Sequence, residues 1–199
     1  MLWRHGQTSW NAEHRFQGQT DIPLDETGEA QAEYAAKRLV TLKPDAIFAS
    51  DLSRAMQTAA ALGILTGLEV TSDKDLRERF GGDWEGLSDE EIRERYPRER
   101  ATWDPPNGEP TAAVADRVSN ALTRIAGTLD DGQLAVVASH GAALRLGASR
   151  ILGLTGDLAG VLGPLSNCSW SVLESSGERW RLLEYNAGTL PEPVIGDDR

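Results

Sequence analysis

Apolar residues follow two different patterns along this chain of 199 residues. Short, almost continuous apolar runs are typical of buried parallel strands, and they occupy residues 45–50 and 134–139. Residues 68–73 form a weaker strand-like segment. Longer segments carry apolar residues at helical spacing, which predicts helices over residues 27–42, 51–67, 111–129 and 140–154. Strands that alternate with helices in this way indicate an α/β fold.

Local signals mark where several of these helices begin and end. Thr27 is the candidate N-cap of the first helix, and Gly67 is placed to end the second. Ser88 and Glu91 form an S-x-x-E capping box, which predicts a further short helix that Pro97 ends.

The two ends of the chain have patterns of their own. Only three residues precede Arg4, so either the true start lies upstream or the first strand is a stub. Towards the other end, alternating runs at 167–175 and 179–185 flank a Ser-Gly pair and predict an antiparallel hairpin. Residues from about 188 to 199 are expected to form a loose tail.

These elements together define the expected architecture. A mainly parallel central sheet with helices on both faces makes a three-layer αβα sandwich, to which the C-terminal antiparallel hairpin is added. A chain of 199 residues can bury one substantial core, so residues 1–199 are expected to form a single domain.

Composition and charge exclude several classes of protein. The formal net charge is −11, whereas nucleic-acid binding depends on clustered Lys and Arg, so no nucleic-acid partner is expected. No apolar stretch reaches the roughly 18 to 20 residues of a membrane span, and Arg4 and His5 interrupt any apolar run typical of a signal peptide. We therefore expect a cytoplasmic protein without a membrane partner. The single Cys168 forms no internal disulfide, and its strand-like surroundings predict a small buried side chain.

Polar side chains with positive charge follow three of the predicted strands. Arg4 and His5 follow the first strand, Arg54 lies in the first turn of the helix after 45–50, and His140 follows 134–139 directly. Because ligands of open α/β sheets bind at the carboxyl ends of the strands, we expect these side chains to converge. Guanidinium groups and helix N-termini both favour phosphate, so the sequence predicts a phosphate site.

Histidine beside a phosphate indicates phosphoryl transfer. A neutral imidazole can attack phosphorus in line, and fixed positive groups stabilise the charge on the transferred group. Gly6 is expected to let the backbone approach the anion closely. The leaving alcohol needs a proton from a carboxylic acid, and the candidates near the predicted turn at 76–86 are Glu78, Asp83 and Glu85.

Five segments of the chain together resemble the histidine phosphatase superfamily, which is also called phosphoglycerate-mutase-like. They are RHGQTSWN (4–11), FQGQTDIPLDETGEAQA (16–32), SDLSRAMQTA (50–59), LRERFGGDWEG (76–86) and SHG (139–141). The segments occur in the family's order and spacing, and they cover the chain from end to end.

The resemblance implies a role for each matched residue. His5 would be the phosphorylated nucleophile and Glu78 the proton donor. Arg4, Arg54 and His140 would act in catalysis by holding the transferred phosphoryl group. The full set of substrate-binding positions that the resemblance implies is Arg4, Asn11, Gln17, Gly18, Arg54, His140 and Gly141.

The segment from about 87 to 110 favours hydrolysis over transfer between substrates. Mutases of this superfamily carry a longer insertion there, because their phosphohistidine must be kept away from water. A short helical lid over 87–110 therefore implies that water accepts the phosphoryl group. A phosphoglycerate mutase and a non-catalytic phospholigand-binding module remain remote alternatives.

Segments outside the shared motifs resemble one subgroup, the glucosyl-3-phosphoglycerate phosphatases. They are ATWDPPNGEP (101–110), SNCSWSVL (166–173) and RWRLLEYNAG (179–188). Trp10 and Trp103 are placed to stack on a sugar, whereas Trp84, Trp170 and Trp180 are expected to pack in the core. A phosphatase of broad specificity, or one for α-ribazole phosphate or fructose bisphosphates, stays open as an alternative.

A metal-dependent hydrolase is the other alternative. Its ligands would be clustered His, Asp or Glu, but the chain has three histidines and no H-x-x-x-H pair. We therefore expect no metal and no cofactor, and a small phosphorylated metabolite as the partner. Homodimer formation, for instance through the C-terminal hairpin, stays open.

Overall fold

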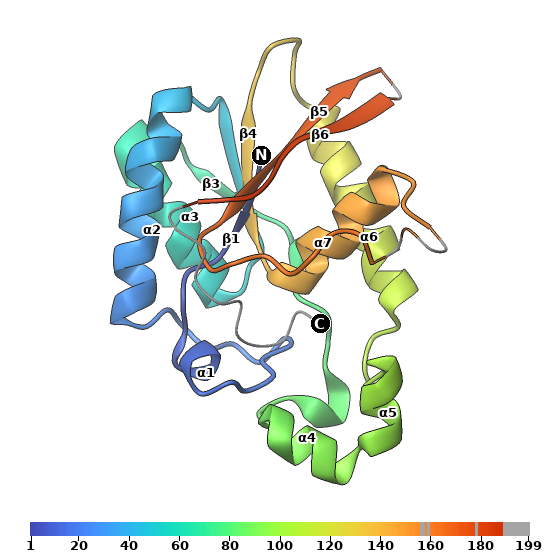
Figure 1. Ribbon diagram of the computed structural model, residues 1–199. Coiled ribbons are helices and arrows are strands. Elements are labelled where there is room, and N and C mark those ends of the chain that lie inside the picture. Colours follow the sequence, from blue (N-terminus) through green and yellow to red (C-terminus); the bar gives the residue numbers. More distant parts are fainter. Residues whose placement is uncertain (156–157, 159, 178, 189–199) are drawn as a thin grey trace.

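The computed structural model describes residues 1–155, 158, 160–177 and 179–188. Within these ranges one six-stranded sheet has the strand order β3-β2-β4-β1-β5-β6 (Figure 1). The strands are β1 (Leu2–Arg4), β2 (Ala46–Ala49), β3 (Val70–Ser72), β4 (Ala135–Ser139), β5 (Trp170–Ser176) and β6 (Arg179–Ala187). The strands from β3 to β1 are parallel, while β5 runs antiparallel to both β1 and β6.

Helices cover both faces of this sheet. They are α1 (Ser9–Ala12), α2 (Glu26–Leu39), α3 (Ser53–Thr66), α4 (Asp89–Arg95), α5 (Pro97–Thr102), α6 (Thr111–Ala126) and α7 (Gly141–Ile151). Figure 1 shows α2 and α3 on one face and α6 and α7 on the other, so the predicted αβα sandwich with its mainly parallel sheet and antiparallel hairpin is confirmed. The short helices α1, α4 and α5 lie beyond the carboxyl ends of the parallel strands.

Two apolar cores result, one on each face of the sheet. Because successive strand residues point to opposite faces, neighbours on the buried strand β4 enter different cores. Val137 lies in the core with Leu144 of α7, whereas Val136 lies in the core with Leu39 of α2 and Leu62 of α3. This two-sided burial explains why β4 has the continuous apolar run that predicted it.

The start of α2 corrects one prediction. Asp25, not Thr27, is the N-cap: its side chain accepts a hydrogen bond of 2.8 Å from the Gly28 amide, and the helix begins at Glu26. Aspartate and threonine are both good N-caps, so the sequence pattern alone did not separate them. The α-helix ends at Leu39, and a 3₁₀ turn continues to Leu42.

Two short helices were not predicted. Thr8 and Asn11 form a capping box that opens α1, between the first strand and α2. The helix that Ser88 opens ends at Arg95, as Pro97 predicted, but Pro97 also occupies the first position of α5. Proline is favoured at that position because its missing N–H would have no intrahelical partner there.

The C-terminal hairpin begins later than predicted. Strand β5 starts at Trp170, and Cys168 is buried, as expected, but in a left-handed turn with a φ of 54°. Of the tryptophans expected in the core, Trp84 is fully buried and Trp170 packs against the core, while Trp180 is half-buried. The first strand has three residues and pairs with β4 and β5.

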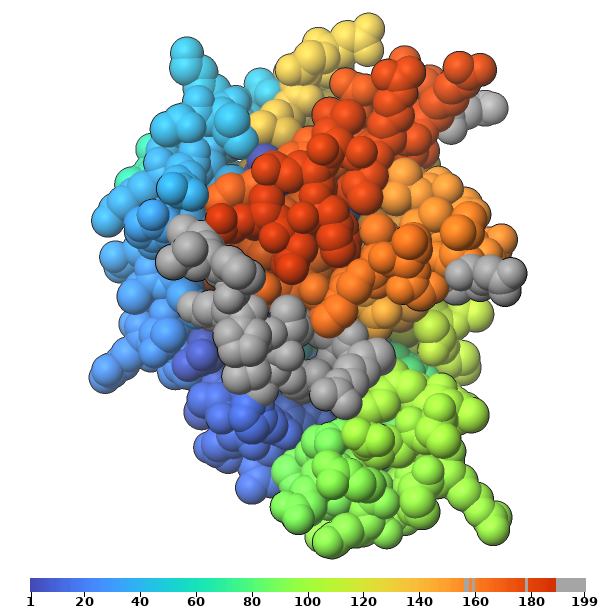
Figure 2. All heavy atoms as spheres, in the orientation of Figure 1, coloured from blue at the N-terminus to red at the C-terminus, as the bar shows by residue number. Residues whose placement is uncertain are grey.

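The segment from 87 to 110 contains α4 and α5, which form one end of the molecule in Figure 2. Its role as a lid stays a prediction, as does the extent of the domain. Residues 189–199, most of the expected tail, lie outside the described residues. No helix in the described ranges is long and apolar enough to cross a membrane.

Candidate active site

The carboxyl ends of β1, β2 and β4 bring the predicted positive groups together. The rings of His5 and His140 lie edge to face with centroids 5.2 Å apart. Arg4, His5, Arg54 and His140 are all buried, with at most 3% of each residue exposed. The backbone amide of His5 also donates to the Ser139 carbonyl at 2.9 Å, which fixes the first motif against the end of β4.

Local contacts determine the tautomer of His5. Its Nδ1 lies 2.6 Å from the Gly6 carbonyl oxygen, and a carbonyl only accepts, so Nδ1 carries the proton. Burial lowers the pKa of His5 well below 6.5, and the charges of Arg54 and Arg4 lower it further. The ring is therefore neutral, with its lone pair on Nε2, which is the form that a nucleophile needs.

His140 is held by a residue that the sequence analysis did not single out. Its Nε2 lies 2.8 Å from the Ser50 hydroxyl, which is itself fully buried at the end of β2. Burial lowers the pKa of His140 well below 6.5, with a further contribution from Arg54. Its buried Nδ1 has no hydrogen-bond partner among the described residues.

The loop after α1 is built around Arg54. Its guanidinium donates to the carbonyl of Gly18 at 2.8 Å and to that of Thr20 at 3.0 Å. Gly18 has a φ of +54°, and a Cβ there would lie 2.1 Å from Glu85 Oε1, so only glycine fits. Arg4, from the opposite side, donates to the Leu165 carbonyl.

Asn11 and Gln17 meet at Thr8. The Thr8 hydroxyl lies 2.9 Å from Gln17 Oε1 and 3.2 Å from Asn11 Oδ1, and Gln17 and Asn11 are both buried. Asn167 donates to the same Asn11 oxygen at 3.3 Å. The Asn11 Nδ2 group is buried without a partner among the described residues, which leaves it as a donor for an anion.

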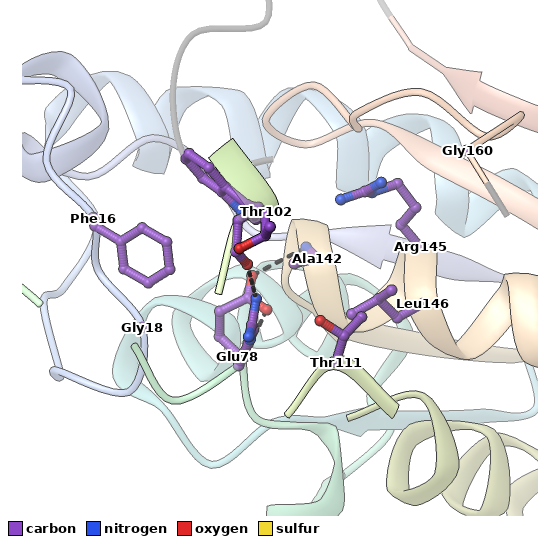
Figure 3. A pocket seen from close by; sticks show the side chains of 11 residues that line it. Phe16, Gly18, Glu78, Thr102, Thr111, Ala142, Arg145, Leu146 and Gly160 are labelled. Carbon is purple, nitrogen blue, oxygen red and sulfur yellow. Dashed lines mark hydrogen bonds between the residues drawn. The ribbon is translucent and has the colours of Figure 1, made fainter. Parts of the chain in front are cut away.

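Glu78 lies at the N-terminus of α7. Its carboxylate accepts the backbone amides of Arg79 at 2.8 Å, Ala143 at 2.9 Å and Ala142 at 3.1 Å (Figure 3). Gly141 is the first residue of that helix and is buried. Glu78 therefore stabilises the helix that follows His140, in addition to the acid role that the resemblance implies.

The other two carboxylates have structural contacts. Glu85 accepts from the amides of Gln19 and Gly81 at 2.8 and 2.9 Å and from the Thr20 hydroxyl at 2.6 Å. It thereby shapes the loop that Arg54 also holds. Asp83 is exposed and accepts from Asn107 Nδ2 at 3.1 Å.

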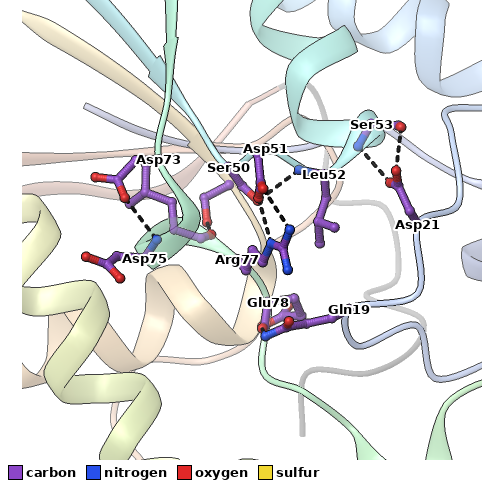
Figure 4. Close-up of polar contacts among 12 residues, drawn as sticks. Gln19, Asp21, Ser50, Asp51, Leu52, Ser53, Asp73, Asp75, Arg77 and Glu78 are labelled. Carbon is purple, nitrogen blue, oxygen red and sulfur yellow. Dashed lines mark hydrogen bonds and ion pairs between the residues drawn. The ribbon is translucent and has the colours of Figure 1, made fainter.

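Ion pairs position the segment that carries Glu78. Arg77 donates twice to Asp51, at 2.7 Å each, and this hydrogen bonding lowers the pKa of Asp51 (Figure 4). Gln19 Nε2 donates to the Glu78 carbonyl at 3.0 Å. These contacts tie the Glu78 segment to the β2–α3 connection and to the loop at residues 17–20.

Arg117 of α6 is a second residue that sequence reasoning missed. It donates to the carbonyls of Asp75, Arg77 and Glu78 at 2.9, 2.6 and 2.9 Å, and to both oxygens of Glu109. Burial opposes ionisation of Glu109, but Arg117 outweighs it and lowers the pKa of that carboxyl. No local pattern marks Arg117, because it lies about 40 residues from the backbone that it holds.

Gly6 makes a close contact within the protein, in addition to its predicted place near the anion. A Cβ on Gly6 would lie 2.5 Å from the Gly28 carbonyl oxygen, so the close approach is between two backbone segments of the protein. Its amide donates to the Thr58 hydroxyl at 3.1 Å. The glycine therefore packs the first motif against the N-terminal turn of α2, while the close approach of its backbone to the anion stays a prediction.

A pocket of about 320 Å³ opens beside Glu78. It is lined by Phe16, Gly18, Glu78, Arg79, Thr102, Trp103, Thr111, Ala142, Arg145, Leu146 and Gly160 (Figure 3). Trp103 reaches the pocket while packing against Trp84 and Phe16 at centroid distances of 5.1 and 6.2 Å. Trp10 is absent from the lining, so the structure does not support its predicted contact with a sugar.

The fold and this site, in which two buried histidines lie beside two buried arginines, define a class of protein: α/β enzymes that act on phosphate esters. The chain belongs to the histidine phosphatase superfamily, branch 1, whose family model matches residues 1–188. It is a phosphoric monoester hydrolase whose substrate is a small phosphorylated metabolite.

Two relatives and one solved structure show which members of the superfamily this chain is similar to. Glucosyl-3-phosphoglycerate phosphatase of Mycolicibacterium vanbaalenii is 37% identical, covering 94% of this chain and 93% of its own. The uncharacterized phosphatase PhoE of Bacillus subtilis is 35% identical, covering 93% of this chain and 92% of its own. The mycobacterial glucosyl-3-phosphoglycerate phosphatase solved with VO3 has a TM-score of 0.89 and 36% identity, covering 94% of this chain and 98% of that structure.

Proposed function

We propose that this chain hydrolyses glucosyl-3-phosphoglycerate through a phosphohistidine formed at His5. The observation that carries the mechanism is the state of the His5 ring, which is buried, neutral and protonated on Nδ1 between two arginines. The similarity to glucosyl-3-phosphoglycerate phosphatases over 94% of the chain supports the choice of substrate.

The first half-reaction transfers the phosphoryl group to the protein. His5 Nε2 attacks phosphorus in line, the bond between phosphorus and the ester oxygen breaks, and the alcohol leaves with a proton from Glu78. Arg4, Arg54 and His140 hold the phosphoryl oxygens, and Asn11 Nδ2 adds a further donor.

The second half-reaction returns the enzyme to its starting state. Water attacks phosphorus and loses a proton to the Glu78 carboxylate, and the bond between phosphorus and Nε2 breaks. Phosphate leaves, and His5 is again neutral. Gln17, Gly18 and Gly141 belong to the backbone and side-chain frame that shapes the substrate site.

Phosphate release from a panel of esters tests this function. The panel contains glucosyl-3-phosphoglycerate, 3-phosphoglycerate, fructose bisphosphates, α-ribazole phosphate and p-nitrophenyl phosphate, all with EDTA present. We expect glucosyl-3-phosphoglycerate to exceed the others by more than about 100-fold in kcat/KM, about 2.7 kcal/mol of transition-state binding. A flat profile would instead identify a phosphatase of broad specificity.

His5→Ala is the control for the mechanism. We expect it to lower turnover by at least about 1,000-fold on every ester, because it removes the nucleophile. Circular dichroism should show a native fold. Substantial activity of a folded His5→Ala protein would refute the phosphohistidine mechanism.

A cytoplasmic location and a homodimer stay predictions of the sequence.

A further inference from the structure

One positive charge in the pocket beside Glu78 is uncompensated. Arg145 of α7 lines this pocket, and it forms no hydrogen bond or ion pair with any residue in the described ranges. Its Nε is buried. A guanidinium that is partly removed from water without a partner is costly to the protein, so its presence calls for an explanation.

The other charged residues of the pocket are already engaged. Glu78 accepts three backbone amides. Arg79 donates to the carbonyls of Glu109 and Trp103 and to the Asp104 carboxylate, at 2.7, 2.8 and 3.1 Å. Arg145 is thus the one pocket cation, among the described residues, whose donors are left for a ligand.

The side chain of Arg145 extends towards the part of the site where the ester bond would break. The amide of Ala142 binds Glu78, and Arg145 lies three residues further along α7, which is about 4.5 Å along the helix axis. Helical side chains lean towards the N-terminus of their helix, which here means towards His140 and Glu78. Figure 3 shows the guanidinium turned into the pocket, opposite Thr102.

This charge is separate from the predicted phosphate site. None of Arg4, His5, Arg54 and His140 lines the pocket, whereas Glu78, the proposed proton donor to the alcohol, does. A ligand group in contact with Arg145 therefore belongs to the alcohol half of the substrate, beyond the ester oxygen.

We propose that Arg145 is a specificity-determining residue that binds a second anionic group, carried by the alcohol half of the substrate. This inference rests on the proposed function, in which the anionic group is the carboxylate of the glycerate. A second phosphate offers the same chemistry, since both present paired oxygens to a guanidinium.

Two matched pairs of esters test the proposal. 3-Phosphoglycerate and glycerol 3-phosphate differ in a carboxylate, and fructose 1,6-bisphosphate and fructose 6-phosphate differ in a phosphate. Each is measured for turnover and as a competitive inhibitor of p-nitrophenyl phosphate hydrolysis, so binding is obtained even for an ester that is not hydrolysed. The variants are Arg145→Gln and Arg145→Lys, with Arg150→Gln as the control.

We expect the Arg145→Gln variant to lose the native protein's preference for the ester that carries a second anionic group. The native protein should bind 3-phosphoglycerate more tightly than glycerol 3-phosphate by about 10- to 100-fold, the span of a charge-assisted hydrogen bond. Arg145→Gln should remove this ratio, and Arg145→Lys should retain part of it. Arg150→Gln removes an equal charge from the same helix, where Arg150 pairs with Asp116, and should keep the native ratio.

The outcomes separate the two proposals. A native protein that does not discriminate within either pair, or an Arg145→Gln protein that keeps the native ratio, overturns the role of Arg145. Preference confined to the bisphosphate pair and lost in Arg145→Gln supports Arg145 and refutes the proposed substrate. Strong turnover of glucosyl-3-phosphoglycerate by Arg145→Gln with unchanged KM supports the proposed function and refutes the further inference.

Discussion

Replacing Glu78 by Gln tests both roles of this side chain, which are to stabilise the N-terminus of α7 and to donate a proton to the leaving alcohol. One oxygen accepts the amides of Arg79 and Ala143 at 2.8 and 2.9 Å, and the other accepts that of Ala142 at 3.1 Å. A glutamine can keep its carbonyl oxygen on the first two amides. Its NH₂ group then faces the Ala142 amide, donor against donor.

The cost to stability can be worked out from these contacts. Leaving one buried donor unsatisfied costs about 1–3 kcal/mol. A cost of about 2 kcal/mol lowers the Tm of a domain of this size by about 4–8 °C. Thermal unfolding followed by circular dichroism measures this shift.

The cost to catalysis depends on the leaving group. General acid catalysis contributes about 10²- to 10⁴-fold, so kcat/KM for 3-phosphoglycerate should fall by that factor in Glu78→Gln. p-Nitrophenolate leaves without a proton, so its ester should lose no more than about 10-fold. Phosphate release from both esters is measured below the melting transition of the variant, and it gives the ratio of the two losses in kcat/KM.

The matched control is Asp83→Asn. Asp83 lies in the 3₁₀ turn Gly82–Trp84, which follows the Glu78 segment, and it is exposed. Its variant should therefore stay within about 0.5 kcal/mol of the native stability and show no dependence on the leaving group. An equal loss on both esters in Glu78→Gln would refute the acid role. A leaving-group dependence in Asp83→Asn, or in Glu85→Gln, would assign the acid to that residue.

Two further predictions concern pH and inhibitors. Burial and Arg54 lower the pKa of His5 and His140 well below 6.5 in the folded protein, so below about pH 6.5 the unfolded chain binds more protons. Stability should therefore be fully present above pH 6.5 and fall at lower pH, by up to about 1.4 kcal/mol per pH unit for each histidine. Urea unfolding at pH 7.5 and 5.5 measures this, and a slope in His5→Asn as steep as the native one would contradict it. Vanadate should inhibit competitively as a mimic of pentacoordinate phosphorus, while EDTA should leave activity unchanged; resistance to vanadate, or loss of activity in EDTA, argues against metal-free phosphoryl transfer.

Much of the fold was predictable because burial leaves a pattern in the sequence. Strand β4 lies between two cores, so all five of its residues are buried and its apolar run is continuous. The ends of the helices were less predictable. Asp25 and Thr27 are both suitable caps by residue type, and the structure shows that Asp25 caps the helix.

The catalytic candidates were predictable for a related reason. His5 and His140 each follow a strand directly, and Arg54 lies in the first turn of the helix after β2. Because parallel strands end at one edge of the sheet, the positions of these residues in the sequence imply that they lie close together. The partners of these residues were not predictable in this way. Ser50 meets His140 across 90 positions of sequence, a separation for which no local pattern exists.

By itself, the sequence determined the αβα architecture, the family motifs and the set of residues that meet at the sheet's carboxyl edge. Hydrophobic periodicity and the order of strands and helices along the chain are local properties that can be read directly from the sequence. Only the tertiary structure decided the protonation of His5, the amides that hold the Glu78 carboxylate, the hydrogen bonds of Arg117 to the Glu78 segment, and the charge of Arg145, with which no described residue pairs. Each of these depends on burial and on which distant group lies within hydrogen-bond reach, and both are set by packing rather than by position in the chain.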